Sequence, residues 1–437
     1  MNAKANNTVD KAQELCERLY LAAKKSKTRK FHALYDKVCR MDMLENGLKR
    51  VKENRGVAGI DGVSIEDILE NKETVLAEIQ RDLVSNEYRP RSVKRVYIPK
   101  PDGRERPLGI PTVRDRIVQA STKQVIEPIF EADFLDCSYG FRPNRCAHDA
   151  LEEIRRATNA GYTIVLDADI EGYFDSINHE RLLEFVSQRI SDRRILKLIR
   201  KWLESGVIDE GVHQETDVGT PQGGVISPLL ANICLHEFDK YWMQQTVVRG
   251  KLIRYADDFV ILFETKEEAE RGLHLVKTKL EELGLKLNER KTKIVEMNEG
   301  KEGFDFLGFY IRRVKSSKYW QYYTQKWPSK KAMNSLKMKI RNVLGSRPKL
   351  LWNTEMIVKE INPILRGWMN YFRYGNSHRK FSQLDSYVQE RLALWWSKKH
   401  NKSGRRWKVD FTYTKFKLCG VQILAGNVVY WSRTSRA

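Results

Sequence analysis

The stretch RYADDFVILF, residues 254–263, sets two adjacent carboxylates, Asp257 and Asp258, in an apolar run typical of β-strands. Arg254 is the only cation in this stretch. Ionised carboxylates that stand side by side repel each other and resist burial unless a positive charge is held between them. The flanking residues predict two strands of a hairpin with both aspartates at its turn. The two carboxylates at such a turn therefore require a bound cation or a cationic side chain close to them.

A second group of acids ends the predicted strand YTIVLDADI, residues 162–170. Side chains alternate along a strand, so Asp167 and Asp169 share a face, about 6.6 Å apart. If this strand neighbours the hairpin, Asp169, Asp257 and Asp258 converge on one point. Carboxylates without His or Cys suit Mg²⁺, and two such ions about 3.5–4 Å apart can clamp an in-line phosphoryl transfer. The YxDD string alone is weak evidence, because each Asp here also fits an ordinary turn residue.

Length and composition set the outer bounds. The 437 residues are 41% hydrophobic, which is enough for two to three domains with large cores. The chain has no apolar run of about 18 residues and no apolar signal core at its N-terminus, so we expect a cytoplasmic protein with no membrane partner. Its six cysteines are scattered singly, which argues against a disulfide framework and a zinc ribbon.

The net charge of +21 is concentrated in the C-terminal third. Residues 311–437 contain 28 Lys and Arg residues and 5 Asp and Glu residues. The other 310 residues contain 50 Lys and Arg residues and 52 Asp and Glu residues, so they are almost neutral. Such asymmetry indicates a polyanionic partner, and nucleic acid is the commonest one. The alternative, a basic surface that only aids solubility, explains so high a local charge less well.

The order of predicted elements favours an α+β fold, because strands and helices alternate without a Rossmann-like rhythm. Short strands are expected around the turn at residues 101–103, a strand over 286–297, and a helix that runs to Trp242 with Ser227 as its N-cap and Pro228 in its first turn. Beyond residue 325 the apolar spacing becomes helical. Two stripes are expected to face a core: Met333, Leu336, Ile340, Val343 and Leu344, then Phe381, Leu384, Val388, Leu392 and Trp395. Most of the eight tryptophans after residue 311 are expected in the core, and a minority are available to stack on bases.

Several stretches resemble, in order, the sequence blocks of reverse transcriptases encoded by group II introns. They are KPDGRERPLGIP (100–111), SYGFRPNRCAHDAL (138–151), DADIEGYFDSI (167–177), GTPQGGVISPLLANICL (219–235), RYADDF (254–259), GLKLNERKTKIV (284–295), FDFLGFYI (304–311) and ILRGWMNYFRYGN (364–376). The resemblance implies a right-hand polymerase with fingers, a palm built on an antiparallel sheet, and a helical thumb or maturase domain. It implies an N-terminal extension with the first fingers elements (1–85), fingers and palm (86–311), thumb (312–400) and a basic nucleic-acid-binding tail (401–437).

The same resemblance implies roles for individual residues. Asp169, Asp257 and Asp258 would be catalytic and would hold two Mg²⁺ ions. Among the dNTP-binding residues, Lys100 and Arg106 would hold the triphosphate, and Phe174 would be a steric gate against the ribose 2′-OH. Gln222 and Gly223 would line the nascent base pair. Lys291 would act as a general acid. For Phe174 a core position, and for Lys291 a solvated strand lysine, remain alternatives. RNA binding would involve Lys330, Lys331, Lys337, Arg366, Arg373 and Lys380.

We therefore expect an RNA-directed DNA polymerase that also binds its group II intron RNA, assists its splicing and supports its mobility. Its partners would be intron RNA, an RNA template with a DNA primer, and dNTPs, with no protein partner required. The resemblance is to a bacterial type without an endonuclease, since the last 37 residues contain one cysteine, so the primer would come from elsewhere. The alternatives are a splicing-only maturase, an RNA-dependent RNA polymerase, and a domesticated reverse transcriptase in defence or repair.

Overall fold

The computed structural model describes residues 2–99, 105–209, 212–214, 218–220, 223–402 and 412–429. The chain forms two compact units of mixed helices and sheets. Unit 1 comprises Met1–Cys146, Ala168–Val260 and Arg271–Lys293, and unit 2 comprises Ala147–Asp167, Ile261–Glu270 and Ile294–Ala437. None of the helices in the described part of the chain is long and apolar enough to cross a bilayer.

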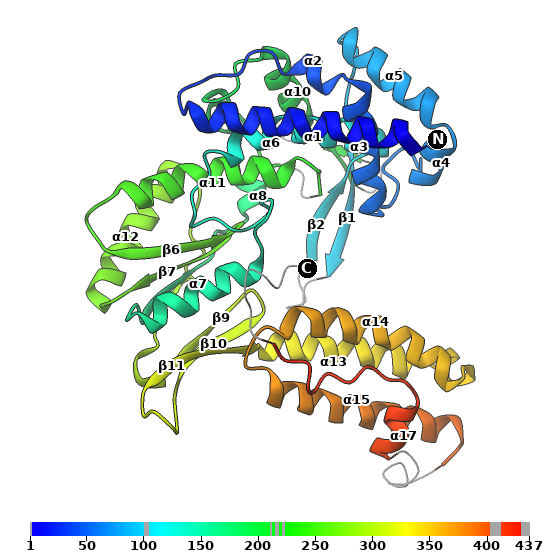
Figure 1. Ribbon diagram of the computed structural model, residues 1–437, viewed down its shortest axis with the longest axis vertical. Helices are drawn as coiled ribbons and strands as arrows, with labels where there is room; N and C mark the ends of the chain where they lie inside the picture. The colour runs from blue at the N-terminus through cyan, green and yellow to red at the C-terminus, as the bar shows by residue number, and fades with distance from the viewer. Residues whose placement is uncertain are drawn as a thin grey trace. The chain divides into compact units, whose positions relative to one another are not determined.

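Unit 1 contains the N-terminal helices and most of the strands that precede residue 260 (Figure 1). Its helices are α1 (Asn2–Lys25), α2 (Tyr35–Val38), α3 (Met41–Glu53), α4 (Ile65–Glu70), α5 (Lys72–Val84), α6 (Val113–Glu131), α8 (Tyr173–Ser176), α9 (His179–Ser187), α10 (Arg193–Leu203) and α11 (Ser227–Gln244). Its strands are β1 (Val93–Pro99), β2 (Glu105–Ile110), β4 (Val207–Asp209), β5 (Val212–Gln214) and β6 (Gly250–Tyr255). Helix α6 is the centre of this unit, and α1 and α3 pack along it.

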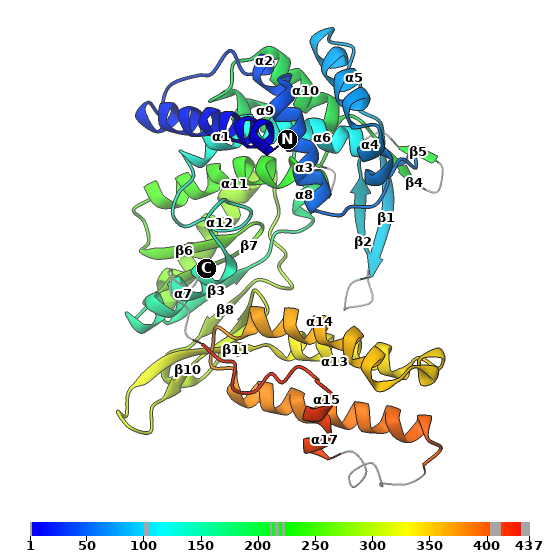
Figure 2. The same ribbon diagram turned by 45° about the vertical axis from the view of Figure 1, so that its right-hand side comes forward.

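Two features show why these segments of unit 1 adopt their structure. Thr112 caps α6 by accepting a hydrogen bond from the backbone N–H of Asp115, which satisfies a donor that the first turn leaves unpaired. Strands β1 and β2 pair antiparallel from Lys94 with Ile110 to Pro99 with Glu105, as the sequence predicts around residues 101–103. Figure 2 shows this hairpin beside β4 and β5, in the sheet order β2-β1-β4-β5.

A second four-stranded sheet has the order β6-β7-β3-β8. The division between the units passes through the elements β3 (Ile164–Ala168), β7 (Asp258–Phe263), α12 (Lys266–Glu282) and β8 (Lys293–Glu296). Strand β8 is much shorter than the predicted strand over residues 286–297. Asn288 accepts hydrogen bonds from the backbone N–H groups of Lys291 and Thr292 through its carbonyl, so this segment turns before the strand begins.

Unit 2 combines α7 (Ala147–Asn159) with a three-stranded sheet in the order β11-β10-β9 and a helical bundle (Figure 2). Its other elements are η1 (Asn298–Gly300), β9 (Gly303–Phe306), β10 (Phe309–Lys315), β11 (Tyr322–Pro328), α13 (Lys330–Gly345), η2 (Pro348–Leu351), α14 (Thr354–Phe372), α15 (His378–Lys399) and α17 (Tyr413–Leu418). Helix α13 packs against both α14 and α15.

The apolar stripes predicted for the bundle are confirmed. All ten stripe residues, five on α13 and five on α15, are buried. The tryptophans of this region differ from the expectation. Among those that the structure describes, Trp395 is fully buried, Trp320 is exposed, and Trp327, Trp352, Trp368 and Trp396 are half-buried.

Residues 412–429 pack on the bundle of unit 2. Asp385 of α15 accepts the backbone N–H groups of Leu424 at 2.9 Å and Ala425 at 2.8 Å. Phe416 and Leu424 are fully buried. Burial of apolar side chains and two amide bonds to one carboxylate therefore hold this part of the basic C-terminal segment on α15.

Candidate active site

The YADD segment forms the hairpin that the sequence predicts. Strand β6 ends at Tyr255, Ala256 and Asp257 make the turn, and Asp258 opens β7. Ala256 has a left-handed backbone, with φ of 59°. A non-glycine residue adopts this conformation only where its surroundings hold it there.

Arg254 is fully buried beneath this turn, and its guanidinium does not pair with the two aspartates at the tip. Its guanidinium donates to both carboxylate oxygens of Asp239 on α11, to the side-chain oxygen of Asn232 at 3.0 Å, and to the carbonyl of Ala256 at 2.9 Å. Arg254 therefore anchors the turn from inside, and it is not the positive partner of Asp257 and Asp258.

A loop that precedes α7 supports the other side of the turn. The backbone N–H of Tyr139 donates to the carbonyl of Arg254 at 2.8 Å. Asn232 donates to the carbonyl of Gly140 at 2.8 Å. A Cβ on Gly140 would lie 2.3 Å from the backbone nitrogen of Ala256, closer than any side chain can come. Glycine is therefore required at position 140 for the loop to meet the hairpin.

Asp169 lies just beyond the end of β3 and is held by residues 286–291. One of its carboxylate oxygens accepts from Lys291 Nζ at 2.7 Å and from Asn288 Nδ2 at 3.1 Å. Ile170 and Leu287 form an antiparallel bridge, and the backbone N–H of Asn288 donates to the carbonyl of Asp169 at 2.8 Å. These bonds fix both the backbone and the carboxylate of Asp169.

Asp257 is half-buried, and burial raises the pKa of its carboxyl above the usual value. The positive charges of Arg106 and Lys291 oppose this increase in pKa, and the negative charge of Asp169 adds to it. Asp257 and Asp169 are thus close enough to interact, with two cations in range. Asp258 is exposed. Within the described ranges, no three His, Cys, Asp or Glu side chains are gathered closely enough to form a ready-made metal cage.

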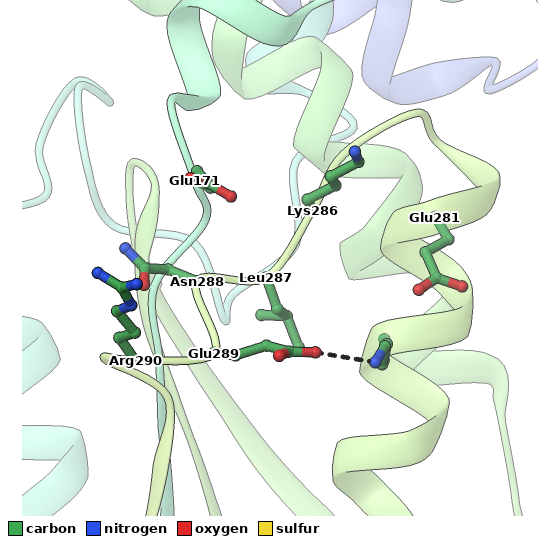
Figure 3. Close-up of a pocket in the computed structure, with 8 residues that line it drawn as sticks. Glu171, Glu281, Lys286, Leu287, Asn288, Glu289 and Arg290 are labelled. Atoms are coloured by element: carbon green, nitrogen blue, oxygen red, sulfur yellow. Dashed lines mark hydrogen bonds and ion pairs between the residues drawn. The ribbon is translucent and has the colours of Figure 1, made fainter.

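A cavity of about 700 Å³ opens beside Asp169 (Figure 3). Its lining combines one residue next to Asp169 with residues of α12 and of the segment that follows it: Glu171, Lys277, Glu281, Lys286, Leu287, Asn288, Glu289 and Arg290. Lys277 and Glu289 form an ion pair of 3.1 Å across it. Acidic and basic side chains alternate around the cavity, so its lining favours no single sign of charge.

Phe174 lies on the short helix α8, five residues after Asp169, and is half-buried. Its carbonyl accepts from the backbone N–H of Thr220 at 2.7 Å. Gly219 has a φ of 97°, and a Cβ there would meet the backbone of Phe174 and Asp175 at 3.1 Å. The glycine-rich loop therefore packs directly on the backbone of Phe174.

Gly223 packs the same loop against β2, the strand that carries Arg106. Gly223 has a φ of 122°, and a Cβ on it would lie 2.6 Å from the carbonyl oxygen of Gly109. Arg106 is exposed on β2 opposite Ile98. Two other predicted dNTP-binding residues, Lys100 and Gln222, lie outside the described residues.

The predicted N-cap of the following helix is wrong by one residue. Helix α11 begins at Ser227 and its N-cap is Ile226, so Ser227 is already helical, while Pro228 stands in the first turn as expected. The side chain of Ile226 makes no capping hydrogen bond. The backbone N–H of Val225 instead donates to the side chain of Gln119 on α6 at 2.8 Å, which fixes the loop before the helix.

The predicted RNA-binding residues all lie on or beside the bundle of unit 2. Lys330 and Lys331 are exposed at the start of α13, and Arg366 is exposed on α14. The other three are half-buried: Lys337, Arg373 and Lys380. Lys337 Nζ lies 5.3 Å from the centre of the Tyr387 ring, and the Arg373 guanidinium lies 5.8 Å from that of Tyr374. These cations are already partly engaged with aromatic rings.

Three residues that the sequence argument left without a role contact the site. Asn288 binds Asp169, Asp239 binds Arg254, and Asn232 joins Arg254 to the loop at Gly140. Asn288 stands within GLKLNERKTKIV, three residues before Lys291, and that proximity was the available signal. Nothing in the spacing of Asp239 and Arg254 indicates that they pair.

The mixed fold of helices and sheets and the basic helical region agree with the class of protein that the sequence comparisons identify. Residues 98–311 match the family described as reverse transcriptase (RNA-dependent DNA polymerase). Residues 333–412 match the maturase-specific domain of group II introns. Together the two matches cover more than half of the chain.

Three relatives illustrate the range of similarity. Protein YkfC of Escherichia coli (strain K12) is 38% identical over 335 residues, which cover 68% of this chain and 85% of YkfC. The group II intron-encoded protein LtrA of Lactococcus lactis subsp. cremoris is 38% identical over 216 residues, covering 49% of this chain and 36% of LtrA. The mitochondrial nuclear intron maturase 2 of Arabidopsis thaliana is 28% identical over 199 residues. These residues cover 36% of this chain and 26% of that maturase.

The chain therefore belongs to the reverse transcriptase family, and it carries the maturase-specific domain of group II introns. It spans about a third of the length of LtrA. Reverse transcriptases as a family use divalent metal ions, and a maturase domain implies binding of intron RNA.

Proposed function

We propose that this chain copies an RNA template into DNA by two-metal nucleotidyl transfer, with Asp169, Asp257 and Asp258 as the catalytic carboxylates. The observation that carries the proposal is the electrostatic interaction of Asp169 with Asp257, with Arg106 and Lys291 close enough to lower the pKa of Asp257. Two acids and two cations in one neighbourhood suit a reaction that moves a triphosphate.

The donor chemistry of this group fits Mg²⁺, because all three side chains offer hard carboxylate oxygens. The buried, partly destabilised charge of Asp257 would be compensated by a bound cation. When bound, the two ions would lower the pKa of the primer 3′-OH and neutralise charge on the leaving pyrophosphate. Asp169 would contribute from the end of β3, and Asp257 and Asp258 from the hairpin.

The protein's own residues would bind and orient the nucleotide. Arg106 would hold the triphosphate as a planar fork, together with Lys100. The glycine-rich loop would line the nascent base pair through Gln222 and Gly223, because a glycine lets the backbone come close. Lys291, on Asp169, would supply charge or a proton to the leaving group.

Phe174 would select deoxyribonucleotides. The Thr220 and Gly219 backbones brace its own backbone, so the ring would be fixed where a 2′-OH would have to fit. Phe174→Ala should lower discrimination against ribonucleotides by about tenfold or more, whereas Phe174→Tyr should retain it. An unchanged ratio of dNTP to NTP incorporation in Phe174→Ala would reject this role for Phe174.

In this proposal residues 1–85 form an N-terminal extension with the first fingers elements, and residues 86–311 form the fingers and palm. Residues 312–400 form the helical thumb or maturase domain, and residues 401–437 form a basic nucleic-acid-binding tail. The thumb and tail would bind the group II intron RNA, assist its splicing and so support its mobility. What supports this is the maturase-specific match together with the exposed Lys330, Lys331 and Arg366. Such binding should weaken linearly in log–log terms with salt.

Primer extension by the full chain tests the polymerase proposal. The assay uses an RNA template with an annealed DNA primer, dNTPs and Mg²⁺. We expect extension that requires Mg²⁺ and that falls by about 1,000-fold or more in Asp257→Asn, since metal stabilisation of the transition state contributes several kcal/mol. Asp36→Asn, which neutralises an exposed aspartate on α2, is the matched control and should extend normally. DNA synthesis by Asp257→Asn at the normal rate would refute the assignment.

A splicing-only maturase is the second candidate. The basic bundle of unit 2 favours RNA binding whether or not the carboxylates are active. It would be supported if the full chain bound and spliced its intron RNA but extended no primer.

A further inference from the structure

The hairpin formed by β10 and β11 carries exposed aromatic rings that the polymerase and maturase assignments leave unused. The two strands pair without a break from Phe309 with Pro328 to Lys315 with Tyr322. Strand β9 pairs with β10 only as far as Arg312. The outer half of the hairpin therefore extends beyond the three-stranded part of the sheet.

The two faces of this hairpin differ. On one face the paired residues Phe309 and Pro328, and Ile311 and Lys326, are buried. The opposite face presents half-buried or exposed residues in the pairs Tyr310 with Trp327, Arg312 with Gln325, and Val314 with Tyr323. The rings of Tyr310 and Trp327 lie 5.4 Å apart. One face is thus a core face, and the other is an accessible strip of aromatic and basic side chains.

The strip ends in a turn that holds two large rings in solvent. Tyr319 is 67% and Trp320 is 74% exposed. Lys318 Nζ lies 5.1 Å from the centre of the Tyr319 ring, and Lys315 Nζ lies 5.0 Å from that of Trp320. Two adjacent exposed rings beside ammonium groups form a surface on which an aromatic ligand can stack.

The turn has a defined conformation. The Ser316 hydroxyl accepts from the backbone N–H groups of Lys318 and Tyr319, both at 3.2 Å. The Ser316 backbone N–H donates to the carbonyl of Gln321 at 2.8 Å, and its carbonyl accepts from Trp320 at 3.1 Å. Trp320 has a left-handed backbone with φ of 56°. For a bulky residue this conformation carries strain, and strain of this kind is found where function requires a particular side-chain direction.

The charge around the hairpin has one sign. Between Asp305 and Glu355 the chain has 12 Lys and Arg and no Asp or Glu. A surface with this charge attracts a polyanion along its whole length. Exposed rings beside ammonium groups match a ligand that offers both an aromatic face and a phosphate, which is a nucleotide with its base unstacked.

We propose that the accessible face of the β10–β11 hairpin, ending at Tyr319 and Trp320, binds a single-stranded segment of RNA by stacking its bases. A duplex fits less well, because its bases are already stacked on one another and present no free face. This inference rests on the proposed RNA-binding function and specifies the kind of RNA segment that one part of the chain contacts.

Fluorescence anisotropy of the full chain with a labelled oligouridylate of about 12 nucleotides, a length within known single-strand site sizes, tests the proposal. Trp320→Ala should weaken binding by about 5- to 150-fold, the range measured for loss of one base–aromatic stack, and Tyr319→Ala should act in the same direction. Neither change should alter the slope of log affinity against log salt. The double change Lys315→Gln and Lys318→Gln should reduce that slope, because it removes phosphate contacts.

Leu351→Ala is the matched control, because Leu351 is 88% exposed in the same acid-free part of the chain but has no ring. It should bind the oligouridylate with the affinity of the wild type. Affinity unchanged in the combined Tyr319→Ala and Trp320→Ala variant would overturn the proposal, as would an equal loss of affinity for an RNA duplex. Primer extension on a preformed template–primer should be unaffected in that variant. If the wild type itself fails to extend a primer, the polymerase proposal is refuted. The oligouridylate measurement then still decides whether the hairpin binds single-stranded RNA.

Discussion

Arg254 and Asp239 form a fully buried ion pair beneath the turn that carries Asp257. Arg254 Nε donates to Asp239 Oδ1 at 2.8 Å, and a second guanidinium N–H donates to the other carboxylate oxygen. The Coulomb attraction and the hydrogen bonds of Asp239 raise the pKa of the arginine against the effect of its burial. Another guanidinium N–H donates to the carbonyl of Ala256, next to Asp257. The pair therefore connects α11 to the tip of the hairpin.

Removal of one member of this pair should destabilise the protein strongly. Asp239→Asn leaves the buried guanidinium without a counter-charge, and we expect a loss of about 3–5 kcal/mol in the free energy of unfolding. Denaturant unfolding measures this loss. A loss below about 1 kcal/mol, the range of exposed pairs, would show that the pair is solvated.

The apolar double variant Arg254→Met with Asp239→Leu separates stability from positioning. It removes both charges, so most of the stability should return, as it does when buried pairs are replaced by apolar side chains. The bond to the carbonyl of Ala256 is still lost, so the rate constant for extension should remain about 100-fold low while the KM for dNTP changes little. A normal rate in this variant would mean that the pair only stabilises the fold.

The contrast between the hairpin and this pair shows what the sequence could reveal. Alternation of polar and apolar residues and the family resemblance predicted the strands, the turn and the two helical stripes of unit 2, because these depend on local periodicity. The partner of Arg254 depends on where α11 comes to lie against β6, which local spacing does not encode. The position of Arg254 next to Asp257 and Asp258 in the chain gave no indication of its buried partner.

The segment 286–297 shows a second limit. Its β-branched and basic residues predicted a continuous strand, but Asn288 turns the chain and the strand is confined to residues 293–296. Asn favours turns since its short polar side chain can bond locally. Here the Asn288 side chain binds Asp169 instead, so a turn and a site contact share one residue. Sequence patterns predict the propensity to turn, but they do not indicate the tertiary partner.

Neutralising Asp257 should stabilise the fold while it abolishes DNA synthesis. Burial raises the pKa of Asp257 in the folded protein above its unfolded value of about 3.9. The folded state therefore binds the proton more tightly, and stability falls as the pH rises through the interval between the unfolded and folded pKa values. At neutral pH the ionised Asp257 carboxylate destabilises the fold to its full extent, so Asp257→Asn should have a higher Tm than the wild type. This difference in Tm should disappear in acid, at a pH below both pKa values.

Asp169→Asn is the control for this effect. Asp169 is paired with Lys291, so its neutralisation removes an attraction and should give no gain in Tm. Thermal unfolding of both variants at neutral and acidic pH, without added metal, checks the expectation. A lower Tm for Asp257→Asn at neutral pH would mean that its interactions with Arg106 and Lys291 outweigh the cost of burying its charge.

Gly223→Ala should impair nucleotide binding. The added Cβ would lie 2.6 Å from the carbonyl oxygen of Gly109, so β2 or the glycine-rich loop must move. Arg106 stands on the same strand, and we expect the KM for dNTP to rise by about tenfold. Gly161→Ala is the control, since Gly161 has a comparable φ of 107° with open space around it.

Gly161→Ala should therefore cost only the penalty of a left-handed alanine, about 1–2 kcal/mol in stability, with an unchanged KM. Steady-state primer extension over a range of dNTP concentrations, combined with denaturant unfolding, separates the two effects. An equal KM in the two variants would show that the loop and β2 adjust to the added methyl group without disturbing the nucleotide.

Lys291→Arg tests whether the lysine on Asp169 transfers a proton or only supplies charge. Arginine keeps the positive charge and can still donate to Asp169, but it does not deprotonate in proteins. If Lys291 protonates the leaving pyrophosphate, kcat should fall by about 10- to 100-fold with the KM for dNTP nearly unchanged. Asn288→Ala, which removes the other donor to Asp169, is the matched control and should leave the pH dependence of kcat intact. A normal kcat for Lys291→Arg, together with a low kcat for Lys291→Met, would assign the residue a purely electrostatic role.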